Sequence, residues 1–249
     1  MRVEVVTSCS VDGYALYGKA CVRSYLKYWP FPLKVYTDSP LKIDGVTTKL
    51  TGQIAGWPHA SRMLPFYNSA AEKPASYLWN AQRYAVKPFV WHDAARKMES
   101  GILAWLDADT VTTGPVPTGI LEDMLGEADV AYLGRGDMHP ENGCVVFRLP
   151  EAMPLLSWCR KAYQKDRYLS WHDGWTDCHA LREGLRAVPT RSRDLTSLAY
   201  PGEWRSHVDA FALSPLGPYV IHLKGRRQKY EGRLIQSTPD DPIEESDDV

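Results

Sequence analysis

Apolar and polar positions along the first forty residues follow the order strand, helix, strand. Val3–Thr7 is rich in β-branched side chains, as is typical of a buried strand. A polar turn precedes a helical pattern over 14–28, which Pro30 and Pro32 end before the apolar run 33–37. Strands and helices that alternate at this spacing predict a mainly parallel sheet with helices on both faces.

The same alternation continues as far as about residue 236. Further strands are predicted at 102–106, 130–133, 144–147 and 219–223, and further helices at about 78–98, 151–167 and 177–186. Residues 51–78 lack clean periodicity and indicate an irregular insertion with a short helix. Residues 237–249 are acidic and nearly devoid of apolar side chains, so we expect a disordered tail. The pattern therefore predicts a single α/β domain over 1–236.

Composition narrows the class of protein. The 249 residues are 44% hydrophobic and 24% charged, and 29 Lys and Arg against 30 Asp and Glu leave a net charge of −1. A nearly neutral protein has no overall field that attracts nucleic acid or anionic lipid. No apolar run approaches the ~20 residues that span a bilayer, and the five cysteines are scattered without a C-x-x-C pair. We therefore expect a soluble, cytoplasmic protein without a disulfide framework or a structural zinc site.

Two carboxylates follow the most apolar strand, in the segment WLDADTV at 105–111. Leaving both buried without a partner would be costly, so packing alone does not account for them. In an extended segment, residues two apart point the same way, which lets Asp107 and Asp109 meet at one cation. Oxygen ligands favour a hard divalent ion such as Mg²⁺ or Mn²⁺, which suits a diphosphate leaving group. The alternative is that both aspartates cap a turn.

His222 is the best candidate for a third ligand. It ends the late apolar strand, and the topology of a parallel sheet would bring that strand end to the edge where Asp109 lies. The segment after it contains Lys224, Gly225 and Arg226, which offer cationic donors on a flexible backbone, as phosphate oxygens require. The alternatives are a structural histidine and a solvated basic face.

The D-x-D segment, the late His-x-x-Gly at 222–225 and the β-α-β opening together resemble the GT-A glycosyltransferases. The resemblance is greatest to the group that includes glycogenin and the bacterial lipopolysaccharide galactosyltransferases, and it touches short islands from Val3 to about Lys229. It implies a GT-A, Rossmann-like α/β fold, with a mixed, mainly parallel sheet flanked by helices. It also implies a hexosyltransferase-like enzyme that takes a sugar from a nucleotide-diphosphate sugar. A UDP-sugar is favoured as donor, and retention of the anomeric configuration is slightly favoured.

The resemblance and the positions of strand ends assign roles to individual residues. Asp107, Asp109 and His222 would hold Mn²⁺ or Mg²⁺. The residues expected to contact the nucleotide, the diphosphate or the donor sugar are Thr7, Ser8, Asp38, Arg83, Lys87, Ala108, Gly143, Lys224, Gly225 and Arg226. The family has Asn-x-Gly where this chain has Glu141-Asn142-Gly143, so the donor-sugar contacts are expected to differ here.

The segment WHDGWTDCHAL at 171–181 resembles the acidic stretch beside the sugar and the acceptor in these enzymes. Asp173 or Asp177 would orient the hydroxyls of the donor sugar, or act as general base if the reaction inverts. Trp171 and Trp175 would stack on the acceptor. The alternative is that the aspartate is a helix cap and that the tryptophans belong to the core.

Two other functions stay open at this point. A sugar nucleotidyltransferase of related fold would need a Gly-rich, basic loop, whereas the turn SCSVDGY at 8–14 has one glycine and no cation. A non-catalytic nucleotide- or nucleic-acid-binding module would use the basic clusters at 191–193 and 226–227. The acceptor of a glycosyltransferase is also open: a glycan, a lipid, a protein or a modified DNA base. The sequence leaves the oligomeric state undecided.

Overall fold

The computed structural model describes residues 1–63, 76–136, 138–196 and 209–223. Its centre is a seven-stranded sheet in the order β3-β2-β1-β4-β7-β6-β8. Neighbouring strands run parallel except at β7, which is antiparallel to both β4 and β6. The strands are β1 (Val3–Cys9), β2 (Leu33–Thr37), β3 (Thr47–Leu50), β4 (Gly101–Leu106), β6 (Val130–Leu133), β7 (Glu141–Leu149) and β8 (Ser192–Asp194). The predicted mixed, mainly parallel α/β sheet is therefore confirmed.

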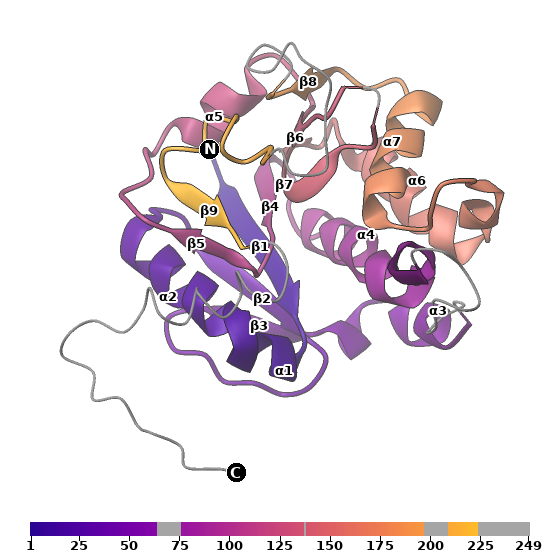
Figure 1. Cartoon of the computed structure of the whole chain (residues 1–249), viewed down its shortest axis with the longest axis horizontal. Helices are drawn as coiled ribbons and strands as arrows, with labels where there is room; N and C mark the ends of the chain where they lie inside the picture. Colours follow the sequence, from indigo (N-terminus) through magenta and orange to yellow (C-terminus); the bar gives the residue numbers. More distant parts are fainter. Residues whose placement is uncertain (64–75, 137, 197–208, 224–249) are drawn as a thin grey trace.

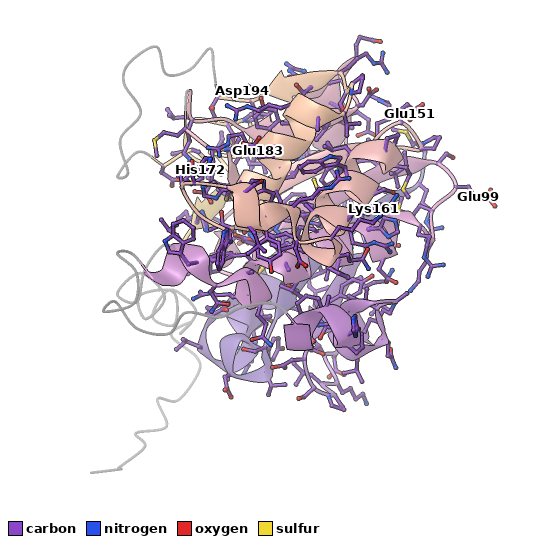
Figure 2. All side chains as sticks on the ribbon, turned by 90° about the vertical axis from the view of Figure 1, so that its right-hand side faces the viewer. Glu99, Glu151, Lys161, His172, Glu183 and Asp194 are labelled. Atoms are coloured by element: carbon purple, nitrogen blue, oxygen red, sulfur yellow. The ribbon has the colours of Figure 1, made fainter. Side chains whose placement is uncertain are left out.

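Helices cover both faces of this sheet (Figure 1). On one face lie α4 (Ala81–Ala95), α6 (Met153–Gln164) and α7 (Asp177–Ala187), and on the other lie α2 (Lys19–Tyr28) and α5 (Ile120–Leu125). Shorter segments connect them: α1 (Val11–Gly13), η1 (Tyr14–Gly18), η2 (Thr51–Gln53), α3 (Trp57–Met63), η3 (Ser76–Trp79) and η4 (Arg167–Ser170). The outer surface on the side of α4, α6 and α7 carries exposed polar side chains such as Lys161 and His172 (Figure 2).

The central strands are buried on both faces because alternate side chains enter two different cores. Leu103 and Trp105 of β4 pack against α4, α6 and α7, whereas Ile102, Ala104 and Leu106 pack on the side of α2 and α5. Burial on both faces is the reason that this strand is an unbroken apolar run. It also means that the first polar side chains of this segment are placed just beyond Leu106, at the edge of the sheet.

A separate two-stranded ribbon joins β5 (Thr110–Thr112) to β9 (Val220–His222) in antiparallel register. Helix α2 holds the ribbon in place, because Trp29 Nε1 donates to Thr112 Oγ1 at 2.9 Å and the amide of Thr112 donates to Ser24 Oγ at 3.0 Å. The late strand was expected at this position in the chain, but as a member of the parallel sheet. His222 is therefore positioned by the β5–β9 ribbon and not by the main sheet.

Four short elements, β3, β5, α5 and β8, were not predicted. They contain three to six residues each, too few for a hydrophobic period to develop. The first helical stretch begins at Val11 rather than Tyr14, because Ser10 Oγ accepts a hydrogen bond from the amide of Gly13 at 2.9 Å and caps it. Helix α4 continues through Pro88 as one element. The predicted tail at 237–249 lies outside the described residues.

Candidate donor and metal site

The parallel strands β1, β2 and β4 bring their carboxyl ends to one edge of the sheet. A cavity of about 660 Å³ opens at this edge, beside the start of α4. This volume lies within the range of about 300–1,000 Å³ that small-molecule sites have. Several of the residues singled out in the sequence line it, namely Ser8, Asp38, Arg83, Lys87, Asp107, Ala108 and Asp109.

The two aspartates of the D-x-D segment are held by a tight turn after β4. The amide of Asp107 donates to the carbonyl of Gly143 at 2.8 Å, and Thr110 donates to the carbonyl of Asp107 through its amide at 3.2 Å and its hydroxyl at 2.8 Å. Trp105 Nε1 donates to Asp107 Oδ1 at 2.7 Å. One oxygen of Asp107 is thus bound by the protein, and Oδ2 faces His222.

His222 meets both aspartates through the β5–β9 ribbon. Its Nε2 lies 3.2 Å from Asp109 Oδ1 and 3.9 Å from Asp107 Oδ2. The register pairs His222 with Thr110, and the amide of Leu223 donates to the carbonyl of Asp109 at 2.7 Å. Backbone hydrogen bonds therefore fix the imidazole beside the carboxylates. The structure brings together the three residues that the sequence analysis assigned to a metal.

A fourth side chain that could bind a metal is Glu141, which was not assigned to the metal from the sequence. The ligand atoms of Asp107, Glu141 and His222 all lie within 4.8 Å of one another. Glu141 and Gly143 are two residues apart on β7, so their side-chain positions share one face. At Gly143 a Cβ atom would lie 2.4 Å from Phe211 and 3.1 Å from His222, so a hydrogen at this position is what lets the imidazole approach.

Lys87 of α4 connects this cluster to α7. Its Nζ lies 2.8 Å from Asp107 Oδ1 and 3.1 Å from Asp177 Oδ2, and it donates to the carbonyl of Asn142 at 3.4 Å. Asp177 opens α7 and is 2% exposed. The sequence analysis expected Lys87 at the diphosphate. In the structure Lys87 neutralises two carboxylates at the wall of the cavity, and its contact with a diphosphate stays a prediction.

Electrostatics favour added positive charge at this cluster. Burial, with a smaller contribution from Asp109, raises the pKa of Asp107 even though Lys87 opposes the shift. Burial alone would lower the pKa of His222, but its hydrogen bond to Asp109 and the charges of both aspartates raise it. Burial likewise opposes the charge of Lys87, but Asp107 and Asp177 raise its pKa well above the usual value. Each of these shifts favours the more positively charged state of its group.

The far end of the cavity is formed by the ends of β1 and β2. Ser8 and Asp38 line it, and Asp38 Oδ1 accepts a hydrogen bond from the amide of Val11 at 3.0 Å. Thr7 is 1% exposed and lies within the sheet rather than in the cavity wall. Tyr17 and Trp57 also line the cavity, and the sequence analysis missed them because they come from a helical turn and from the irregular insertion.

The second aspartate segment is divided between two environments. Asp173 is exposed and accepts two hydrogen bonds from Arg182, at 2.7 and 2.9 Å, which lower its pKa to about 2. Asp177 is buried against Lys87. Trp171 and Trp175 are 8% and 6% exposed and belong to the core, as the alternative interpretation had it, and their acceptor role stays a prediction. The predicted phosphate-binding residues Lys224, Gly225 and Arg226 lie outside the described residues.

The fold resembles that of a known structure. Over 94% of this chain and 96% of the other, it is similar to the crystal structure of the galactosyltransferase LgtC in complex with donor and acceptor sugar analogues, with a TM-score of 0.51 and 12% sequence identity. The chain has the GT-A fold.

Comparison of the sequence with family models and with curated proteins identifies no relative of this GT-A chain. At 12% identity the likeness to LgtC establishes the architecture and not the substrate. None of the helices described for this GT-A chain is both long enough and apolar enough to cross a membrane.

Proposed function

We propose that the protein is a metal-dependent, hexosyltransferase-like glycosyltransferase that moves a sugar from a nucleotide-diphosphate sugar to an acceptor. The observation that carries this proposal is the meeting of Asp107, Asp109 and His222 at a cavity whose wall also contains Arg83 and Lys87. The GT-A fold supports it, because the similar structure LgtC is a galactosyltransferase. A UDP-sugar is the favoured donor.

The three side chains fit Mn²⁺ or Mg²⁺. Ligand atoms about 2.1 Å from an octahedral ion stand about 3 Å apart, which is close to the 3.2 Å between His222 Nε2 and Asp109 Oδ1. The imidazole favours Mn²⁺ over Mg²⁺, because Mg²⁺ prefers oxygen ligands alone. When bound, the ion would offset the charge that develops on the leaving diphosphate.

The other residues of the cavity would hold the donor. Asp38, at the end of β2, stands where an acidic side chain accepts hydrogen bonds from ribose hydroxyls in doubly wound sheets. Arg83 is exposed on α4 and lines the cavity, where its guanidinium would donate to phosphate oxygens. Ser8 would contact the base at the end of β1.

Retention of configuration is favoured by the position of Asp177. An inverting enzyme needs a general base within reach of the acceptor hydroxyl. Asp177 is 2% exposed and bound to Lys87, and Asp173 lies against Arg182, away from the residues that line the cavity. Both carboxylates are therefore engaged in ion pairs, which argues against either of them as the general base of an inverting reaction.

For the acceptor, we propose a chemical class. A nucleic-acid acceptor gains no support from the basic cluster at 191–193, because Arg191 binds Asp129 and Arg193 donates to the carbonyl of Asp123 at 2.7 Å. A sugar hydroxyl of a glycan or of a glycolipid is the simpler acceptor.

Calorimetric titration with UDP-, GDP-, CDP- and ADP-sugars, each with Mn²⁺ and with EDTA, tests the proposal. We expect one nucleotide to bind in the presence of Mn²⁺ and to lose its affinity with EDTA and in Asp109→Ala. Asp44→Ala is the matched control, because Asp44 is exposed and does not line the cavity.

Two results would contradict the proposal. One is the absence of binding by every donor in the wild-type protein with Mn²⁺. The other is equal affinity with Mn²⁺ and with EDTA, which would leave a nucleotide-binding protein without a metal role.

A further inference from the structure

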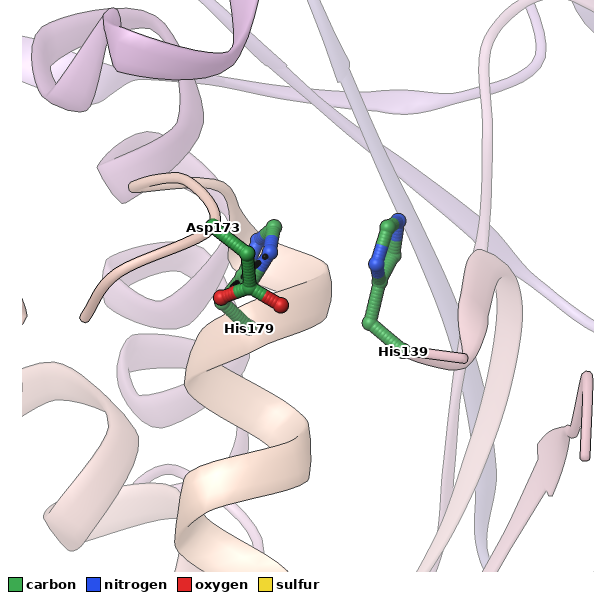
Figure 3. Close-up of side chains that lie close together, drawn as sticks. All are labelled: His139, Asp173 and His179. Atoms are coloured by element: carbon green, nitrogen blue, oxygen red, sulfur yellow. Dashed lines mark ion pairs between the residues drawn. The ribbon is translucent and has the colours of Figure 1, made fainter. Parts of the chain in front are cut away.

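A second group of metal-ligating side chains lies beside α7 (Figure 3). His139 precedes β7, Asp173 precedes α7, and His179 lies near the start of α7. The ligand atoms of these three residues lie within 4.8 Å of one another, and none of the three lines the donor cavity. Three segments of the chain thus bring two imidazoles and a carboxylate to one place.

His179 directs one ring nitrogen toward the carboxylate of Asp173. The residue is 0% exposed, and its Nδ1 shares a hydrogen bond of 2.7 Å with Thr176 Oγ1. Its Nε2 is buried and faces Asp173 Oδ1 at 3.2 Å, an ion-pair contact rather than a well-aligned hydrogen bond. Histidines that bind metals through one nitrogen commonly have the other held by such a hydrogen bond. A metal ion between this nitrogen and the carboxylate would satisfy both groups at once.

His139 faces the same space from the opposite side. The rings of His139 and His179 are 4.5 Å apart between centroids, at an interplanar angle of 30° (Figure 3). Two imidazoles that bind one ion at about 2.1 Å have ring centres about 4.5–5.3 Å apart, from right-angled to tetrahedral ligand geometry, so the rings here stand at the near end of that range. The indole of Trp171 is stacked against His179 at 6.5 Å and adds an apolar wall.

We propose that His139, Asp173 and His179 form a second metal site, which takes a transition-metal ion of the Zn²⁺ class. Two imidazoles and one carboxylate are a ligand set that Zn²⁺ uses and Mg²⁺ avoids. The ion would join the segment before β7 to the start of α7. These segments continue into Glu141 and Asp177, so the second site would hold two parts of the donor site in register.

Arg182 modulates this site. Its guanidinium binds both oxygens of Asp173, at 2.7 and 2.9 Å, and thereby orients the carboxylate as outer residues orient metal ligands. Its positive charge also lowers the affinity for a cation. We therefore expect reversible binding of Zn²⁺ rather than an ion that survives treatment with EDTA.

Equilibrium dialysis of the full chain against Zn²⁺, after treatment with EDTA, tests the second site. The background is the double variant Asp109→Ala, His222→Ala, which lacks two of the three ligands proposed for the donor site. We expect this protein to bind one equivalent of Zn²⁺. His139→Gln in this background should lower the affinity about tenfold or more. His172→Gln should leave it unchanged, because His172 is an exposed neighbour of Asp173 outside the cluster.

Two further measurements guard against misfolding. Zn²⁺ should raise the Tm of the background protein and of His172→Gln, and should not raise that of His139→Gln. Co²⁺ in place of Zn²⁺ should give visible absorption bands that His179→Gln also removes. Failure of the background protein to bind Zn²⁺, or equal losses in His139→Gln and His172→Gln, would overturn the proposal. Neither result depends on glycosyltransferase activity.

Discussion

Two pairs of aspartates lie near the candidate site, and the structure uses them in opposite ways. Asp107 and Asp109 are two residues apart after a strand, and both carboxylates face His222 at the edge of a cavity. Asp173 and Asp177 are four residues apart where a loop enters a helix. They turn in different directions, toward Arg182 and toward Lys87.

The difference lies in how each pair is neutralised. The second pair turns apart, to an arginine and to a lysine, whereas the carboxylates of the first pair converge on one imidazole and Lys87 binds Asp107. Two carboxylates that converge on one point favour a single ion between them, whereas two carboxylates that turn apart cannot share one ion. Spacing on an extended backbone therefore carries more information about a metal site than the number of acidic residues does.

Lys87→Met should have the largest effect, because Lys87 neutralises one member of each pair. Removal of the cation would leave two carboxylates facing each other at a wall that is mostly buried. We expect a loss of about 3–5 kcal/mol in the free energy of unfolding, measured by urea denaturation. Lys42→Met, at an exposed lysine, is the control. A loss no greater than that of the control would show that the bridge between the pairs adds nothing to stability.

Asp109→Asn separates metal binding from stability in the first pair. The amide keeps the size of the side chain but lowers its affinity for a cation. We expect Mn²⁺ to bind about a hundredfold more weakly, which is about 2.7 kcal/mol, with a smaller change in stability than in Lys87→Met. Calorimetric titration with Mn²⁺ measures this, with Asp44→Asn as the control. If Mn²⁺ bound Asp109→Asn as tightly as it binds the wild type, the first pair would not differ from the second as a metal site.

Gly143→Ala tests the approach of His222 to the first pair without altering a ligand. The new methyl group would lie 2.4 Å from Phe211 and 3.1 Å from His222, so both rings must shift. We expect a loss of about 1–3 kcal/mol in stability, together with weaker Mn²⁺ binding. Gly114→Ala is the matched control, because nothing lies within 4 Å of the position that a Cβ would occupy there. Normal Mn²⁺ affinity in Gly143→Ala would show that the imidazole is not a ligand.

Asp173→Asn should have the smallest effect, because its ion pair with Arg182 is exposed. We expect a loss of less than about 1 kcal/mol at neutral pH. The pKa of Asp173 is lowered from 3.8 to about 2, so the pair stabilises the fold above pH 3.8 and this contribution is lost as the pH falls through about 2. Urea denaturation at several pH values should show the wild type and the variant converging in strong acid. A difference that grows in acid would contradict this assignment.

The sequence predicted the fold best where burial is continuous. Strand β2 coincides with the predicted run at 33–37, and β4 with the apolar segment before Asp107. It failed for β5, because three residues acquire their strand character from a partner more than a hundred positions away. Local propensity carries no trace of such a pairing.

The candidate site was predictable to a similar degree. The two aspartates could be found because i, i+2 spacing after a strand has a geometric meaning. His222 was named correctly as their neighbour, although by way of the wrong sheet. Glu141 was noted only as a departure from a motif, because its approach to Asp107 arises from the pairing of β4 with β7. The bridge formed by Lys87 depends on helix packing, which no local pattern reveals.

The β5–β9 ribbon also sets the order in which the site is assembled during synthesis. All seven strands of the main sheet precede residue 195, whereas His222 leaves the ribosome later. A nascent chain would therefore present a group of carboxylate oxygens before it has an imidazole. Such a group prefers the hard ions Mg²⁺ and Ca²⁺, and the histidine would shift the preference toward Mn²⁺ only when β9 pairs with β5. The proposed selectivity for Mn²⁺ would thus be acquired only after β9 is synthesised, and a chain that stops before β9 would lack it.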